Sequence, residues 1–166
     1  MKRVDLTTYC NVAVENRDFD FERCSDAEMV FSVPLDWLQK WLEKNEYLCI
    51  DNFLDEYIYD DSQQIFEDAK KDGVEYIHNL DCSYCREELY TDYPYLEILH
   101  RFSEELKTLN IYLNADEEAM IIERISHHNN CSSLTVVTYG EQNVSLECED
   151  CMNTLIDSDI ILEGRQ

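Results

Sequence analysis

Two Cys-x-x-Cys pairs are the residues of this sequence whose type and spacing indicate chemistry. Cys82 and Cys85 form the first pair, and Cys148 and Cys151 form the second. Two intervening residues let both sulfurs point at one ion from a tight turn, and two such turns complete a tetrahedral thiolate shell for Zn²⁺. The 62-residue gap between the pairs is longer than in compact zinc ribbons, but the cost of closing a loop grows only logarithmically with its length. The sequence predicts a structural zinc ion held by Cys82, Cys85, Cys148 and Cys151.

Other interpretations of the two pairs remain open. The thiols could be reduced and unliganded, or one pair could be a redox motif. Redox chemistry is the weakest of these, because neither pair is expected to open a helix after a strand. The acidic neighbours Glu147, Glu149 and Asp150 are also expected to raise the pKa of the Cys148 thiol, which suppresses its reactivity.

A second cluster, His127, His128 and Cys131, precedes the second cysteine pair. One of these residues could replace a cysteine in the zinc shell. We favour a different role for the histidines, as a polar cap at the C-terminal end of a helix, where a positive charge interacts well with the helix dipole.

The charge of the chain excludes several classes of function. The 37 acidic residues outnumber the 13 basic residues in a chain of 166, for a formal net charge of −24. Such a protein repels nucleic-acid phosphates and anionic membranes. Acids gather in two stretches without Lys or Arg, between Lys44 and Lys70 and from residue 125 to residue 164. We expect the acids of the first stretch to bind a partner with a positive surface, and the candidates are Asp51, Asp55, Glu56, Asp60 and Asp61. Acidity that serves solubility alone is the alternative.

Signatures of catalysis are missing from the sequence. It contains no Gly-x-Ser-x-Gly, His-Glu-x-x-His, phosphate-binding loop or dinucleotide-binding glycine motif. A zinc ion with four thiolate ligands has no open position for water. We therefore expect a protein that is not an enzyme. The first residues lack the apolar run of a signal peptide, so a cytoplasmic location is expected, with reduced cysteines.

The elements that must position these residues predict an α+β fold. We expect short antiparallel strands and about four to five helices in a single domain over residues 1–166, with a possible division into 1–80 and 81–166. Strands are expected near 4–14, 28–33 and 74–80, the last one leading to the first cysteine pair. Helices are expected after Pro34, before Gly73, after Pro94 and after Asn114, the last two as a helical hairpin. A β-hairpin over 134–139 and 143–148, with a turn at Gly140, leads to the second pair.

A small, acidic, cysteine-rich chain of this kind resembles phage and mobile-element inhibitors of host defence. The segments Phe31-Ser-Val-Pro34 with Trp37-Leu38, Phe53-Leu-Asp-Glu-Tyr57 and Asp60-Asp61 are similar to segments of small proteins from Gram-positive phages and conjugative elements. The two cysteine pairs add a likeness to the zinc-containing type II-A anti-CRISPR proteins, which inhibit Cas9.

The resemblance implies a non-catalytic inhibitor in the cytoplasm of a bacterial host. Such a protein binds Cas9, a basic nucleic-acid-handling protein, and prevents the loading of guide or target DNA into its positively charged channel. Two alternatives are a restriction inhibitor that mimics duplex DNA and an immunity protein that neutralises a basic toxin. The first predicts a double row of carboxylates at phosphate spacing, and the second predicts binding to the toxin and not to Cas9.

Overall fold

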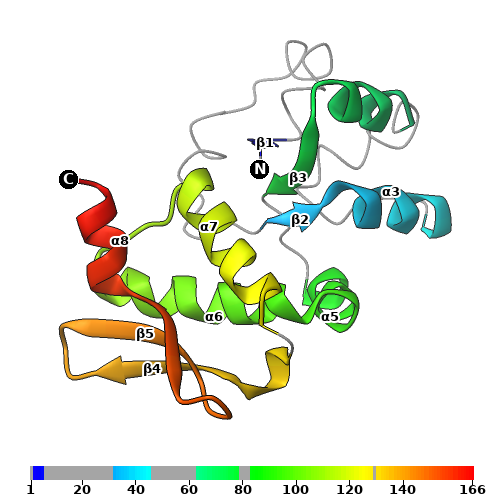
Figure 1. Cartoon of the computed structure of the whole chain (residues 1–166). Coiled ribbons are helices and arrows are strands. Elements are labelled where there is room, and N and C mark those ends of the chain that lie inside the picture. The colour runs from blue at the N-terminus through cyan, green and yellow to red at the C-terminus, as the bar shows by residue number, and fades with distance from the viewer. Residues whose placement is uncertain (1, 6–31, 46–62, 79–82, 129) are drawn as a thin grey trace. The chain divides into compact units, whose positions relative to one another are not determined.

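The computed structural model describes residues 2–5, 32–45, 63–78, 83–128 and 130–166 (Figure 1). Contacts divide the chain into two compact units, Met1–Leu89 and Tyr90–Gln166, which we call the N-terminal and C-terminal units. The described residues form six helices and two three-stranded sheets. The predicted α+β fold class is therefore confirmed, with one helix more than the upper expectation.

The N-terminal unit contains a sheet in the order β1-β3-β2. Strand β3 (Val74–His78) pairs parallel to β1 (Lys2–Asp5) and antiparallel to β2 (Val33–Pro34), so this sheet is mixed. Helix α3 (Leu35–Lys44) begins directly after Pro34, as predicted, and buries an apolar face that includes Leu38 and Trp41. Residues 63–71 form a further helix, which ends shortly before Gly73, where φ is +75°.

Helix α5 (Ser83–Asp92) was not predicted. It begins one residue after Cys82 and follows strand β3, so the expectation that neither cysteine pair opens a helix after a strand was wrong for the first pair. Cys85 and Leu89, one helical turn apart, are its buried residues. Cys85 of the predicted metal-binding pair therefore belongs to the buried face of a helix.

Two helices of the C-terminal unit form the predicted helical hairpin. Helix α6 (Pro94–Thr108) has proline at its first position, where no backbone N–H is needed. Helix α7 (Ala115–Ser126) begins with a capping box, in which the side chains of Asn114 and Glu117 each accept a hydrogen bond from the backbone N–H of the other residue. Both helix starts therefore lie where the sequence placed them.

The second sheet follows α7 in the order β4-β5-β6 and is antiparallel. Strands β4 (Leu134–Tyr139) and β5 (Asn143–Cys148) have the predicted bounds and are joined by a turn at Gly140, where φ is +63°. Strand β6 (Asn153–Asp157) leads into helix α8 (Ser158–Gly164), whose first turn is capped by the Asp157 side chain. In Figure 1, α6 lies along β4 and β5 within this unit. The core between them is apolar and includes Leu99, Phe102, Leu106, Ile121, Ile125, Val144, Leu146 and Ile156.

No helix in the described ranges is long and apolar enough to cross a membrane.

Candidate metal centre

Three side chains of the C-terminal unit converge on one point. They are His128, just after α7, and Cys148 and Cys151, at the turn between β5 and β6. One ligand atom from each lies within 4.8 Å of the others. The closest pair is Nε2 of His128 and Sγ of Cys148, 2.7 Å apart. This arrangement could hold a metal ion.

The Cys148–Cys151 turn contains one backbone-to-sulfur hydrogen bond and is followed by a left-handed residue. The backbone N–H of Cys151 points at Sγ of Cys148 over 3.4 Å, so the sulfur of the first cysteine accepts a hydrogen bond from the second. Met152, the next residue, has φ of +56° and an exposed side chain. This left-handed residue directly precedes β6, and the ligand atoms of the two cysteines lie within 4.8 Å of each other.

The surroundings of Cys148 favour its thiolate. Its side chain is buried, with 1% of the residue exposed. Hydrogen bonds from the Ser133 hydroxyl, the Cys151 backbone and thiol, and the His128 ring together lower the pKa of the Cys148 thiol to about 6, against the opposing effect of burial. A thiol with this pKa is mostly deprotonated at pH 7, which is the form that binds metals.

The expectation that neighbouring acids raise the pKa of Cys148 was therefore wrong. Glu147 precedes Cys148 on a strand, where successive side chains point to opposite faces. Its carboxylate accepts hydrogen bonds from the Tyr139 hydroxyl and the Ser145 hydroxyl. Glu149 and Asp150 are exposed at the turn. The hydrogen-bond donors around the sulfur consequently outweigh the acidic residues beside it in sequence.

The His128 side chain is held by its neighbour. The backbone N–H of Asn130 donates a hydrogen bond to Nδ1 over 3.2 Å, which directs Nε2 toward Cys148. The sequence favoured a helix cap for both histidines. His127 does occupy the C-cap position of α7, with Nε2 3.9 Å from the Glu123 carboxylate. The side chain of His128 instead joins the cysteine pair.

A signal for His128 was present in the sequence. The β-hairpin predicted over 134–148 places the residues before 134 beside the residues after 148, because its strands are antiparallel. His128 lies on the first of these segments and the Cys148–Cys151 pair on the second. The sequence prediction instead paired Cys148 and Cys151 with the other Cys-x-x-Cys pair, Cys82 and Cys85.

The structure does not test the other two predicted ligands, Cys82 and Cys85, as members of this group. Cys82 falls outside the described residues. Cys85 is fully buried in α5 and belongs to the N-terminal unit. A shared site for the two cysteine pairs stays a prediction.

All five predicted partner-binding acids, Asp51, Asp55, Glu56, Asp60 and Asp61, lie outside the described residues, so their role stays a prediction.

The C-terminal unit is itself acidic, with 15 acidic residues and four basic residues. Each basic residue is engaged within the unit. Arg101 and Lys107 pair with glutamates on α6, Arg124 donates to the Leu155 carbonyl, and Arg165 binds Glu117.

Several carboxylates of the C-terminal unit have no such partner. Six exposed acids form no ion pair and accept no side-chain hydrogen bond among the described residues: Glu105, Asp116, Glu141, Glu149, Asp150 and Glu163. Glu149 and Asp150 lie between the two cysteines of the turn. Two donors of the candidate metal centre and part of the uncompensated charge thus occupy the same loop.

No protein-family profile, curated protein or solved structure matches the chain.

Proposed function

We propose that this chain is a non-catalytic binding protein, stabilised by a zinc ion, that inhibits a basic nucleic-acid-handling protein. The observation that carries the proposal is the unequal use of charge in the C-terminal unit. All four cations are engaged internally, whereas at least six exposed carboxylates are left without a partner among the described residues.

Zinc is the metal that best suits the donors. Two thiolates and one imidazole are soft and borderline ligands, which favour Zn²⁺ over the oxygen-seeking Mg²⁺ and Ca²⁺. The ion would join the end of α7 to the β5–β6 turn, two segments that already meet through the contact between His128 and Cys148. Its role would be to hold these segments together.

The unpartnered carboxylates support binding to a positive surface. Self-repulsion among them destabilises the folded chain, and a basic partner would remove this cost while steering the encounter from a distance. Internal ion pairs would have been the simpler way to relieve the repulsion. The four available cations serve instead to fix helices and the C-terminal end of the described chain.

Cas9 is the partner that we propose, on the resemblance of the sequence to the type II-A anti-CRISPR proteins. Its nucleic-acid channel is strongly basic and holds a guide–target heteroduplex by its backbone. An acidic protein that occupies part of this channel would prevent the loading of guide or target DNA without any chemistry of its own. Asp51, Asp55, Glu56, Asp60 and Asp61 would make the main contact.

Metal analysis tests the zinc component. The purified full chain should contain about one zinc ion per molecule, and a chelator should remove it with loss of hydrogen-exchange protection in β4, β5 and β6. A folded protein that contains no metal and gains no protection when Zn²⁺ is added would contradict this component.

Charge reversal tests the binding component. Calorimetric titration should detect binding to Cas9 that weakens as salt increases, and the D51K/D55K/D60K/D61K variant should lose it. A matched variant, E105K/D116K/E141K/E163K, makes the same change of charge on exposed residues of the C-terminal unit outside the Cys148–Cys151 turn. If both variants bind equally weakly, net charge and not the predicted segment determines affinity.

The same titration separates the alternatives. Failure to bind Cas9, together with binding to a restriction endonuclease that duplex DNA displaces, would favour the DNA-mimic function. Binding only to a basic toxin would favour the immunity function. Either result would overturn the Cas9 proposal while leaving the zinc component intact.

A further inference from the structure

Cys131 stands in the same relation to His128 as Cys151 does to Cys148. Two residues separate the members of each pair, and 16 residues separate Cys131 from Cys148. The segment therefore reads His-x₂-Cys-x₁₆-Cys-x₂-Cys. Two ligand pairs of this spacing, about 15 to 20 residues apart, are characteristic of compact zinc sites. The 62-residue gap from Cys85 lies far outside that range.

The β4–β5 hairpin brings the two pairs side by side. Leu134, three residues after Cys131, pairs directly with Cys148 across the two strands. The backbone N–H of Glu149 donates to the Ser133 carbonyl over 2.9 Å, and the Ser133 hydroxyl lies 3.5 Å from Sγ of Cys148. On the other side of Cys131, His128 contacts the same sulfur. Cys131 is thus flanked by two residues that touch Cys148.

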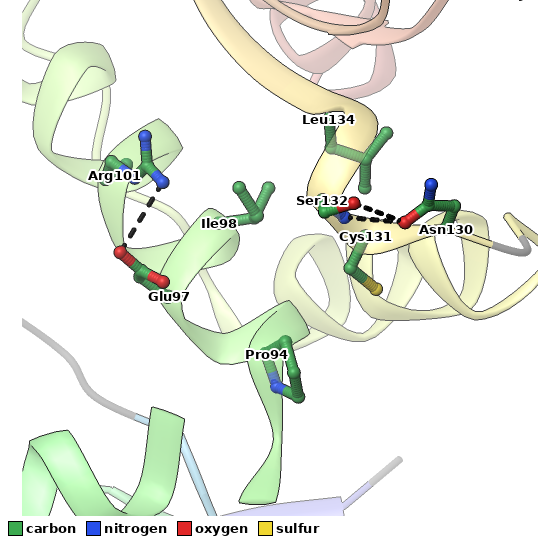
Figure 2. Close-up of a pocket in the computed structure, with 8 residues that line it drawn as sticks. All are labelled: Pro94, Glu97, Ile98, Arg101, Asn130, Cys131, Ser132 and Leu134. Carbon is green, nitrogen blue, oxygen red and sulfur yellow. Dashed lines mark hydrogen bonds and ion pairs between the residues drawn. The ribbon is translucent and has the colours of Figure 1, made fainter. Parts of the chain in front are cut away.

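The Cys131 thiol lies outside the group of three donors. It borders a pocket of about 470 Å³, shared with Pro94, Ile98 and Leu134 among others (Figure 2). The residue is half-buried in the short 3₁₀ turn η2 (Cys131–Ser133). A change of rotamer about χ1 is enough to move the sulfur to another side of this turn.

Metal binding by His128 would itself displace the segment that carries Cys131. An imidazole that binds a metal through Nε2 keeps its remaining proton on Nδ1. The Asn130 N–H faces Nδ1 at 3.2 Å, so two donors would meet there. The Asn130 peptide must turn to avoid this clash. Cys131 is the next residue, so this movement is transmitted to the backbone that carries its thiol.

We infer that Cys131 is the fourth zinc ligand, and that His128, Cys131, Cys148 and Cys151 form a closed tetrahedral site. This inference rests on the proposed zinc component. All four ligands come from the C-terminal unit, which makes Cys82 and Cys85 unnecessary for the site. Three thiolates and one imidazole leave no position for water, so the ion is structural.

X-ray absorption on the zinc-loaded full chain tests the ligand set without mutation. The inference expects three sulfurs and one nitrogen around the ion. Four sulfurs would overturn it and would favour the set Cys82, Cys85, Cys148 and Cys151. Two sulfurs with lighter ligands would also overturn it, because Cys131 would then not be bound.

Cobalt substitution of matched variants gives a second test. In C131S, the thiolate-to-cobalt charge-transfer absorption should fall by about one third, since one of three thiolates is lost, and zinc affinity should fall by about 100-fold or more. C85A, which replaces a buried cysteine of the other unit, should keep both values. Unchanged absorption in C131S, or a loss in C85A, would overturn the inference. A wild-type chain that binds neither metal would instead contradict the zinc component itself.

Discussion

Leu134 and Cys148 face each other directly across β4 and β5, and this pair fixes where the Cys148–Cys151 turn lies relative to the end of α7. A shift of register by one residue would carry Cys148 to the other face of the sheet. The distance between His128 and Cys148 therefore depends on the hairpin as much as on the two residues.

Replacement of His128 tests whether this residue binds zinc or only caps the C-terminal end of α7. H128A should lower the zinc affinity of the full chain by about 100-fold or more, because the ion loses its nitrogen donor. H127A is the matched control, since the His127 side chain is exposed and lies 3.9 Å from the Glu123 carboxylate, outside the group of three donors. Competition titration with a zinc indicator measures both variants. An equal loss of zinc affinity in H128A and H127A would show that both histidines act only through the stability of α7.

Arg165 should stabilise the C-terminal unit more than any other cation there. Its Nε and Nη2 donate to the two carboxylate oxygens of Glu117 over 2.6 and 2.8 Å, and Nη2 also donates to the Tyr112 carbonyl over 2.6 Å. R165A leaves the buried Glu117 carboxylate without this partner and should cost about 1–3 kcal/mol of the free energy of local unfolding.

The control for Arg165 is Arg101, whose exposed pair with Glu97 spans 3.4 Å. R101A should change the same free energy by less than about 1 kcal/mol. Native-state hydrogen exchange of α7 and α8 amides measures both. A smaller effect for R165A than for R101A would contradict the assigned role of the Glu117 pair.

The same pair predicts how stability depends on pH. The hydrogen bond from Arg165 is the main cause that lowers the pKa of Glu117 below its ordinary value of 4.5, and burial opposes it. As pH falls, the unfolded chain takes up this proton before the folded chain does. The contribution of Glu117 is therefore complete above pH 4.5 and is lost as pH falls through the lowered folded-state value.

E117Q tests this dependence because glutamine cannot titrate. The difference in local unfolding free energy between wild type and E117Q should be constant near neutral pH and should shrink below pH 4.5. Hydrogen exchange followed across this range is complicated by its own pH dependence, so denaturant unfolding of α7 and α8, followed by NMR, is the measurement. A difference that does not change with pH would show that Glu117 keeps its ordinary pKa.

The β4–β5 turn should require glycine at position 140 because of its positive φ, and not because a side chain there would lack space. Its φ is +63°, and a Cβ added there would meet no atom within 4 Å. G140A should therefore destabilise the hairpin by about 1 kcal/mol through backbone strain. Gly164 also has free space but no positive φ, so G164A should be neutral or slightly stabilising. Hydrogen-exchange rates of the β4 and β5 amides, measured in G140A and G164A, show whether the hairpin is destabilised only where φ is positive.

Local signals account for the parts of the fold that the sequence predicted. Pro94 marks the start of α6, Asn114 and Glu117 mark the start of α7, and Gly140 marks the hairpin turn. Each signal acts within a few residues, so no tertiary information is needed. The predicted bounds of β4 and β5 agree with the structure for the same reason.

Helix α5 was missed because its pattern is weak and ambiguous. Only Cys85 and Leu89 are buried on it, and Cys85 also belongs to a Cys-x-x-Cys pair. The His128 contact was missed for a different reason. This contact depends on which segments the hairpin brings together. The sequence prediction paired Cys148 by cysteine spacing, not by the antiparallel pairing of β4 and β5. The pKa of Cys148 likewise depends on donors from Ser133 and His128, 15 and 20 residues away.

The short hairpin also determines when the metal centre can assemble. His128, Cys148 and Cys151 lie within 24 consecutive residues. Hairpins of this kind close in about 1–10 μs, long before slower contacts between distant segments are made. Binding of an ion by these three residues would therefore be a local event of low contact order. An early zinc-bound hairpin would be a nucleus on which α6 and α7 condense.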